Sequence, residues 1–185
     1  MGMNLQMLQT NLAALIKSRE VVIPREDNYL AAVKDSKNLL LIKKIGLWWR
    51  KIQIEPYCVL TSNYLKSDGR FEREIQDFIS KKDFSLFREE VGLQFLDYVI
   101  SRHLDSLSQS LAEFELAIIK SKLGEHVKCS ISWDYEPYSI ISALLHNTLT
   151  AADLSGGKYE VFVDSSNKEE LFTVKGYVLS HPEYA

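Results

Sequence analysis

The sequence predicts a mainly α protein with a small α+β module at its carboxy-terminal end. Eight glycines and four prolines among 185 residues are few for an all-β protein, which needs frequent turns. Apolar residues recur at spacings of three and four over roughly the first two thirds of the chain, which is typical of helices. After Gly124 the spacing changes to two, which is typical of strands. We therefore expect a helical bundle domain over 1–124 and a small α+β module over 125–185.

Several elements of the helical part have predicted limits. The first amphipathic helix is expected to end near Arg19. Apolar residues are densest over 35–54, and a helix that is apolar around most of its circumference is typically buried, so we expect this helix in the middle of the bundle. Pro56 is expected to open the next helix, which precedes a turn at 67–69.

The last two helices of this part are predicted in different ways. A stripe of apolar residues predicts the first of them, and an N-cap residue and a terminating glycine predict the limits of the second. The stripe with helical spacing consists of Phe84, Phe87, Val91, Phe95, Tyr98 and Val99. The final helix is expected to begin after an N-cap at Asp105 or Ser106 and to stop at Gly124.

The carboxy-terminal module is expected to contain three strands and one helix. A strand over 127–133 alternates apolar and polar residues, and Pro137 starts a short helix. A turn at 155–158 precedes two further apolar segments, 159–163 and 171–178. Because a polar loop separates these two segments, they should form an antiparallel β-hairpin.

Charge and hydropathy exclude several classes of protein. Lys and Arg together number 22 and Asp and Glu 25, for a formal net charge of −3, and no polybasic tail is present to bind nucleic acid. No segment approaches the roughly 18 apolar residues of a membrane span, and the start of the chain lacks a secretion signal, so a cytoplasmic protein without membrane contact is expected. Cys58 and Cys129 are far apart and are interpreted as buried thiols.

Motifs for metal binding and for nucleophilic catalysis are missing from the sequence. No histidine has a glutamate three positions before it, as di-iron bundles require; the histidines are His103, His126, His146 and His181. A group of acidic residues is better interpreted as a solvated helix surface: Glu72, Glu74, Glu89, Glu90 and Asp97. The patterns GxSxG, GxxxxGK[ST] and GxGxxG do not occur. We therefore expect neither a metal site nor a catalytic site on this chain.

Two features are candidates for binding other molecules. Trp48 and Trp49 point about 100° apart on a helix, so either both are buried in a central helix or one anchors a partner. The hairpin of 159–163 and 171–178 can leave an edge strand open, to which an extended peptide can add through main-chain hydrogen bonds. The alternative is that the hairpin is only a structural flap.

Three stretches also resemble a known family. They are the helix segment over 111–117 (LAEFELA), the strand end over 133–137 (WDYEP) and the hairpin strand over 159–164 (YEVFVD). In this order they resemble MbnC-type partner proteins of methanobactin biosynthesis. The helical part is more loosely similar to the HvfC and BufC type of partner proteins, which accompany TIM-barrel, iron-dependent peptide-modifying enzymes.

The resemblance implies a non-catalytic subunit with no cofactor of its own, bound to an iron enzyme that converts cysteines of a ribosomal precursor peptide to oxazolone and thioamide groups with dioxygen. It also implies that the carboxy-terminal module holds the leader segment of that precursor. With the hairpin hypothesis, the expected leader-binding residues are Tyr159, Glu160, Val161, Phe162, Val163, Phe172, Val174 and Tyr177. The expected partner-binding residues are Trp48 and Trp49.

Two other functions compete with this one. A helical nucleic-acid-binding or transcriptional regulatory module should show a basic stripe, and the only concentrated basic group is Lys43, Lys44, Arg50 and Lys51. A stand-alone bundle enzyme would need metal ligands, and the sequence does not show them.

Overall fold

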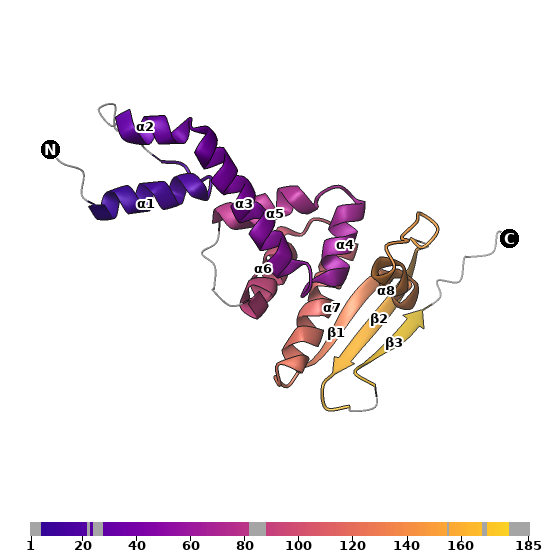
Figure 1. Ribbon diagram of the computed structural model, residues 1–185. Coiled ribbons are helices and arrows are strands. Elements are labelled where there is room, and N and C mark those ends of the chain that lie inside the picture. Colours follow the sequence, from indigo (N-terminus) through magenta and orange to yellow (C-terminus); the bar gives the residue numbers. More distant parts are fainter. Residues whose placement is uncertain are drawn as a thin grey trace. The chain divides into compact units, whose positions relative to one another are not determined.

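The chain is described by a computed structural model over residues 5–21, 23, 28–81, 88–154, 156–167 and 170–177 (Figure 1). Over these residues it is mostly helical, with a three-stranded antiparallel sheet in its carboxy-terminal part, which confirms the predicted fold class. By its packing the chain forms two compact units, Met1–Gln53 with Arg73–Phe84 and Ile54–Glu72 with Ser85–Ala185.

The first unit is helical and small. Its helices are α1 (Leu5–Ile16), α2 (Asn28–Lys34), α3 (Lys37–Ile54) and α5 (Phe71–Lys81), of which the last two extend slightly into the second unit. Its buried cluster is built around Leu15, Leu30 and Leu39, one residue from each of the first three helices. The backbone N–H of Leu39 donates to Ser36 Oγ at 3.1 Å, so the serine caps the first turn of α3.

The expectation that the helix over 35–54 lies in the middle of the bundle is wrong. Helices α1 and α2 bury only the stripe of α3 that contains Leu39. Six large apolar side chains of α3 are 46–57% exposed: Leu40, Leu41, Ile42, Ile45, Trp48 and Trp49. A unit of a few short helices cannot enclose all sides of α3, so apolar residues around a helix do not by themselves place it in a core.

The second unit combines helices and the sheet. Its helices are α4 (Val59–Ser67), α6 (Arg88–Arg102), α7 (Ser106–Lys122) and α8 (Pro137–Leu145), and its strands are β1 (Lys128–Tyr135), β2 (Gly156–Asp164) and β3 (Phe172–Tyr177). The predicted limits of α7 are confirmed: Asp105 accepts from the Ser108 N–H at 2.8 Å, and Gly124, with φ of 87°, follows the helix. Phe84 and Phe87 of the predicted stripe lie outside the described residues.

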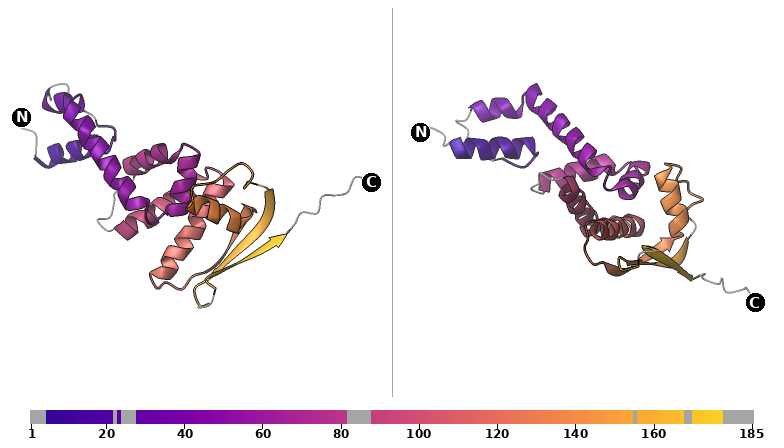
Figure 2. Two further views of the ribbon diagram at one scale, coloured as in Figure 1. Left: turned by 45° about the vertical axis from the view of Figure 1, so that its right-hand side comes forward. Right: turned by 60° about the horizontal axis from the view of Figure 1, so that its bottom comes forward.

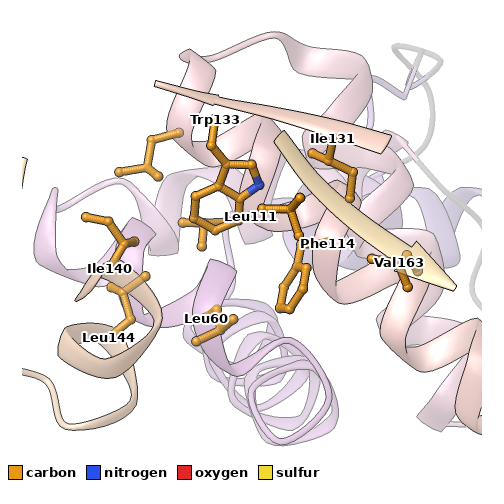
Figure 3. Packing of buried hydrophobic residues seen from close by; sticks show 11 residues of the cluster. Leu60, Leu111, Phe114, Ile131, Trp133, Ile140, Leu144 and Val163 are labelled. Atoms are coloured by element: carbon orange, nitrogen blue, oxygen red, sulfur yellow. The ribbon is translucent and has the colours of Figure 1, made fainter. Parts of the chain in front are cut away.

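The sheet has the strand order β1-β2-β3, and its inner face packs on helices of the same unit (Figures 1 and 2). Trp133 and Ile131 of β1 and Val163 of β2 face this core, as Figure 3 shows. The rings of Phe114 on α7 and Trp133 meet edge to face, with 6.0 Å between their centroids. The core also takes Leu60 of α4, Leu111 of α7 and Ile140 and Leu144 of α8. Since α4 and α7 share this core, the second unit extends well before the predicted boundary near Gly124.

A carboxylate from α7 caps the first turn of α4. Pro56 does not open this helix, because residues 55–57 form a turn and α4 begins at Val59. Its N-cap residue, Cys58, makes no side-chain capping bond. Instead, Glu115 of α7 accepts hydrogen bonds from the backbone N–H groups of Leu60 at 2.7 Å and Thr61 at 2.9 Å. Two of the N–H groups that a helix start leaves unpaired are thus satisfied from another helix.

Burial raises the pKa of Glu115 from its ordinary 4.5 to about 7, although the hydrogen bonds from Thr61 and Leu60 act in the opposite direction. The buried thiol of Cys58 lies in the same region, and burial, together with the charge of Glu115, raises its pKa as well. Cys129 is only partly buried.

The acidic group predicted to be solvated is only partly so. Glu72, Glu90 and Asp97 are exposed, but Glu74 on α5 is fully buried. Its Oε1 atom lies 3.2 Å from Arg73 Nη2, so the buried carboxylate forms an ion pair with the neighbouring guanidinium group. The side chain of Glu89 is outside the described residues.

Protonation of Glu115 is expected to make stability depend on pH. Between pH 4.5 and about 7 the folded state holds one more proton at this site than the unfolded chain, so raising the pH over this range favours unfolding. Over this range the free energy of unfolding is expected to fall by on the order of 3 kcal/mol. Urea unfolding across this range should therefore show a fall in the free energy of unfolding that Glu115→Gln abolishes. An equal pH dependence in the parent and the variant would contradict this assignment.

Candidate functional site

The structure identifies which strand of the hairpin is an edge. β2 is the central strand, paired with β1 on one side and with β3 on the other. The segment Tyr159–Val163 is therefore covered on both sides and cannot accept an added strand. Within the described part of the chain, β3 pairs only with β2, so the candidate edge for a peptide is β3 (Figure 2).

The hydrogen-bonding pattern shows which backbone groups of β3 face outward. The N–H of Asp164 donates to the carbonyl of Leu171 at 3.1 Å. Bonded residues alternate along an antiparallel ladder, so Thr173 and Lys175 pair with β2. The N–H and C=O groups of Phe172, Val174 and Gly176 consequently point away from β2, toward the open side of the sheet.

The opposite edge of the sheet, on β1, is partly occupied. The carbonyl of Ser132 points away from β2, and it accepts a hydrogen bond from Ser110 Oγ of α7 at 2.7 Å. A helix that bonds to an edge strand obstructs the addition of another strand there. Of the two edges, β3 is therefore the more accessible.

Inward-facing side chains hold β3 in place. Phe172 meets Phe114 edge to face at 5.0 Å and lies 5.8 Å from Tyr138, between ring centroids. Val174 packs against the same core. Of the expected leader-binding residues, these two can meet a docked strand through their backbone groups, while their side chains anchor the edge to the unit.

Two other expected residues, Val161 and Val163, have buried side chains on the central strand. Tyr159 also faces inward and covers two glycines, Gly157 and Gly176. A Cβ atom added at Gly157 would come within 2.4 Å of the Tyr159 ring, and one at Gly176 within 3.0 Å. Glycines inside strands often mark close packing of this kind, which is the sequence signal that could have revealed it.

The outer face of the sheet carries a shallow hollow beside the open edge. It has a volume of about 430 Å³, and Phe162, Ser130 and Thr173 are among the residues that line it. The ammonium of Lys175 lies 4.8 Å from the centroid of the Phe162 ring, and Glu160 is the register partner of Lys175. Phe162 and Glu160 thus face outward, as the alternation of the strand predicts, and the side chain of Tyr177 lies outside the described residues.

Charged residues line the other end of this hollow. Lys128 Nζ lies 3.3 Å from Asp164 Oδ2, and Ser166 donates to the same carboxylate from its backbone N–H at 2.9 Å. The hydroxyl of Ser166 also donates to Asp164. This hydrogen bond is the largest of the interactions that lower the pKa of Asp164 to about 2. The hollow therefore combines an aromatic ring with charged groups of both signs.

The two indoles predicted to bind a partner lie on the surface of α3. Trp48 is 56% and Trp49 49% exposed, and their rings meet edge to face at 5.4 Å. The alternative that both are buried is therefore wrong. Trp48 shares one helix stripe with the exposed Leu41 and Ile45, at positions i, i+4 and i+7.

Neither a metal centre nor a membrane span is found in the described part of the chain. No three His, Cys, Asp or Glu side chains there come together as a metal site. None of the helices that the structure describes is both long and apolar enough to cross a bilayer. Comparison with protein-family models, with curated proteins and with solved structures finds no match to this chain.

Hydrogen exchange should reveal the alternation along β3. The amides of Thr173 and Lys175 are paired with β2 and are expected to exchange at least about tenfold more slowly than those of Val174 and Gly176, which face outward. Amide exchange of the full chain, followed by nuclear magnetic resonance, measures all four. Protection of Val174 equal to that of Lys175 would mean that the edge is already covered.

Proposed function

We propose that this chain is a non-catalytic subunit that holds an extended peptide on strand β3 and presents it to a partner enzyme. The observation that carries the proposal is the uncovered edge of β3, where the backbone groups of Phe172, Val174 and Gly176 face outward. Main-chain pairing to such an edge supplies affinity for a strand of almost any sequence.

Selectivity would come from the hollow beside the edge. Thr173 of β3 lines it together with Phe162, so a side chain of the docked strand next to Thr173 can reach the Phe162 ring. An apolar group would contact the ring, and a charged group would meet Lys128 or Asp164 at the other end. A leader segment with an apolar residue at that position fits this arrangement.

The surface of α3 is the candidate contact with the enzyme. The stripe of Leu41, Ile45 and Trp48, with Trp49 beside it, exposes large apolar side chains side by side on one helix. Contiguous apolar surface of this kind is typical of protein interfaces, and tryptophan is the residue most often found at their energetic centre.

Together with the resemblance to MbnC-type proteins, these surfaces support a specific form of the proposal. The peptide is the leader of a ribosomal precursor, and the partner is a TIM-barrel enzyme whose iron oxidises precursor cysteines to oxazolone and thioamide groups in methanobactin-type copper-chelator biosynthesis. The subunit itself carries no cofactor and acts in the cytoplasm as part of a heterodimer. A nucleic-acid-binding or regulatory module remains the alternative, and its supporting feature is the basic group on α3.

Leader binding can be tested at one backbone position. Val174→Pro removes an outward N–H, so we expect about tenfold weaker binding, equivalent to about 1.4 kcal/mol. Val174→Ala is the matched control, because it removes the same packing but keeps the N–H, and it should bind within about threefold of the parent. The measurement is fluorescence anisotropy with a labelled extended peptide that carries an apolar residue at the position next to Thr173. If a folded Val174→Pro variant binds as tightly as Val174→Ala, strand addition at β3 is refuted.

The enzyme contact can be tested by removing both indoles. Trp48→Ala with Trp49→Ala should weaken the complex with the proposed TIM-barrel partner enzyme by about tenfold or more, because the variant lacks the two largest exposed apolar side chains of this surface. Tyr29→Ala is the control, since Tyr29 is an exposed aromatic residue of the same unit at 57%. Co-expression and size-exclusion chromatography compare the two. Complete co-elution of the double variant at nanomolar concentration would count against this surface.

A further inference from the structure

The first unit contains a hollow whose lining is strongly basic. It has a volume of about 600 Å³ and lies between α3, α5 and the end of α1. Its cationic side chains are Lys17, Lys43, Lys44, Arg50 and Arg73, of which Arg73 forms an ion pair with Glu74 at 3.2 Å. The one carboxylate of the lining, Asp77, already forms an ion pair with Lys81 at 2.7 Å. Because the chain as a whole has a formal net charge of −3, the positive charge of this hollow is a local feature of the surface.

The cations of α3 are spread along the hollow. Lys43 and Arg50 are seven residues apart, on the same helix face, which places them about 10 Å from each other along the axis. The ammonium groups of Lys43 and Lys44 have no hydrogen-bond or ion-pair partner among the described residues. Arg50 is partly buried and donates to the neutral oxygen of Gln53 at 2.7 Å, and burial lowers its pKa. Carboxylates spaced along the hollow would stabilise these charges.

Aliphatic side chains lie between the charges. Leu40 and Leu47 share the face of α3 that lines the hollow, and Ile16 and Ile79 line it from α1 and α5. The described lining contains no aromatic ring, so a nucleic-acid base would find none on which to stack. A single phosphate group would be too compact to reach cations about 10 Å apart.

We infer that this hollow binds a short acidic peptide segment in which carboxylate side chains alternate with aliphatic ones. Carboxylates spaced along a peptide match the spaced cations, and the aliphatic residues match Leu40 and Leu47. The volume is in the range of ligand sites and suits a segment of a few residues. The site lies on the face of α3 opposite to Leu41, Ile45 and Trp48, and it is a second peptide contact that does not depend on the edge of β3.

The probe for this site is a capped peptide of four glutamates and two leucines, acetyl-Glu-Leu-Glu-Glu-Leu-Glu-amide, titrated calorimetrically into the full chain. We expect saturable binding that weakens from about 50 mM to about 200 mM salt, and at least about tenfold weaker binding of the same peptide with Gln in place of Glu. Lys43→Gln with Arg50→Gln should weaken binding by about tenfold or more. Lys37→Gln is the matched control, because it removes a charge from the same helix but does not line the hollow, and it should leave binding within about twofold.

Several results would overturn the inference. One is the absence of saturable binding of the acidic peptide. Another is a loss of affinity in Lys37→Gln as large as that in the double variant. A third is that inorganic pyrophosphate or single-stranded DNA binds at Lys43 and Arg50 more tightly than the acidic peptide does. Circular dichroism verifies that each variant is folded. Val174→Pro should bind the acidic probe like the parent, so a failure of the β3 proposal and a failure of this one give different results.

Discussion

The edge-to-face packing of Trp133 on Phe114 is the contact on which the second unit depends. It joins the inner face of the sheet to α7, and Phe172 of β3 also packs edge to face with the same Phe114 ring. A one-residue slip of any strand would turn its apolar side chains away from this core, so the packing sets the register of all three strands. That register in turn places Phe162 on the outer face and directs the backbone groups of Val174 outward.

Helix α7 has a wider role than that of one wall of the core. Its Glu115 caps α4, and its Ser110 bonds to the edge of β1. The first contact fixes a helix start that has no capping side chain of its own, at the cost of a buried carboxyl group with a raised pKa. The second leaves β3 as the accessible edge. One helix thus determines both the packing of this unit and which edge of the sheet is left open.

The first unit has a different organisation, because its few helices bury one stripe of α3 and expose the others. Residues 41, 45 and 48 form an apolar stripe, while residues 43, 47 and 50 face the basic hollow, about 200° around the helix. With 18 residues and no acidic side chain, α3 presents an apolar surface on one side and a cationic surface on the other. The two proposed contacts lie on separate faces of one helix, so they do not exclude each other.

Local patterns in the sequence predicted most of the secondary structure, but not helix α2 or the start of α4 at Val59. The change of apolar spacing after Gly124, the capping carboxylate of Asp105 and the alternation around Phe162 each depend on neighbouring residues, so α7, the three strands and the outward face of Phe162 followed from the sequence. Tertiary packing decided the rest. Whether Trp48 is buried depends on how many helices surround α3, and which hairpin strand is open depends on where β1 pairs. The capping role of Glu115 and the basic hollow join residues far apart in the chain, and only the folded structure brings such residues together.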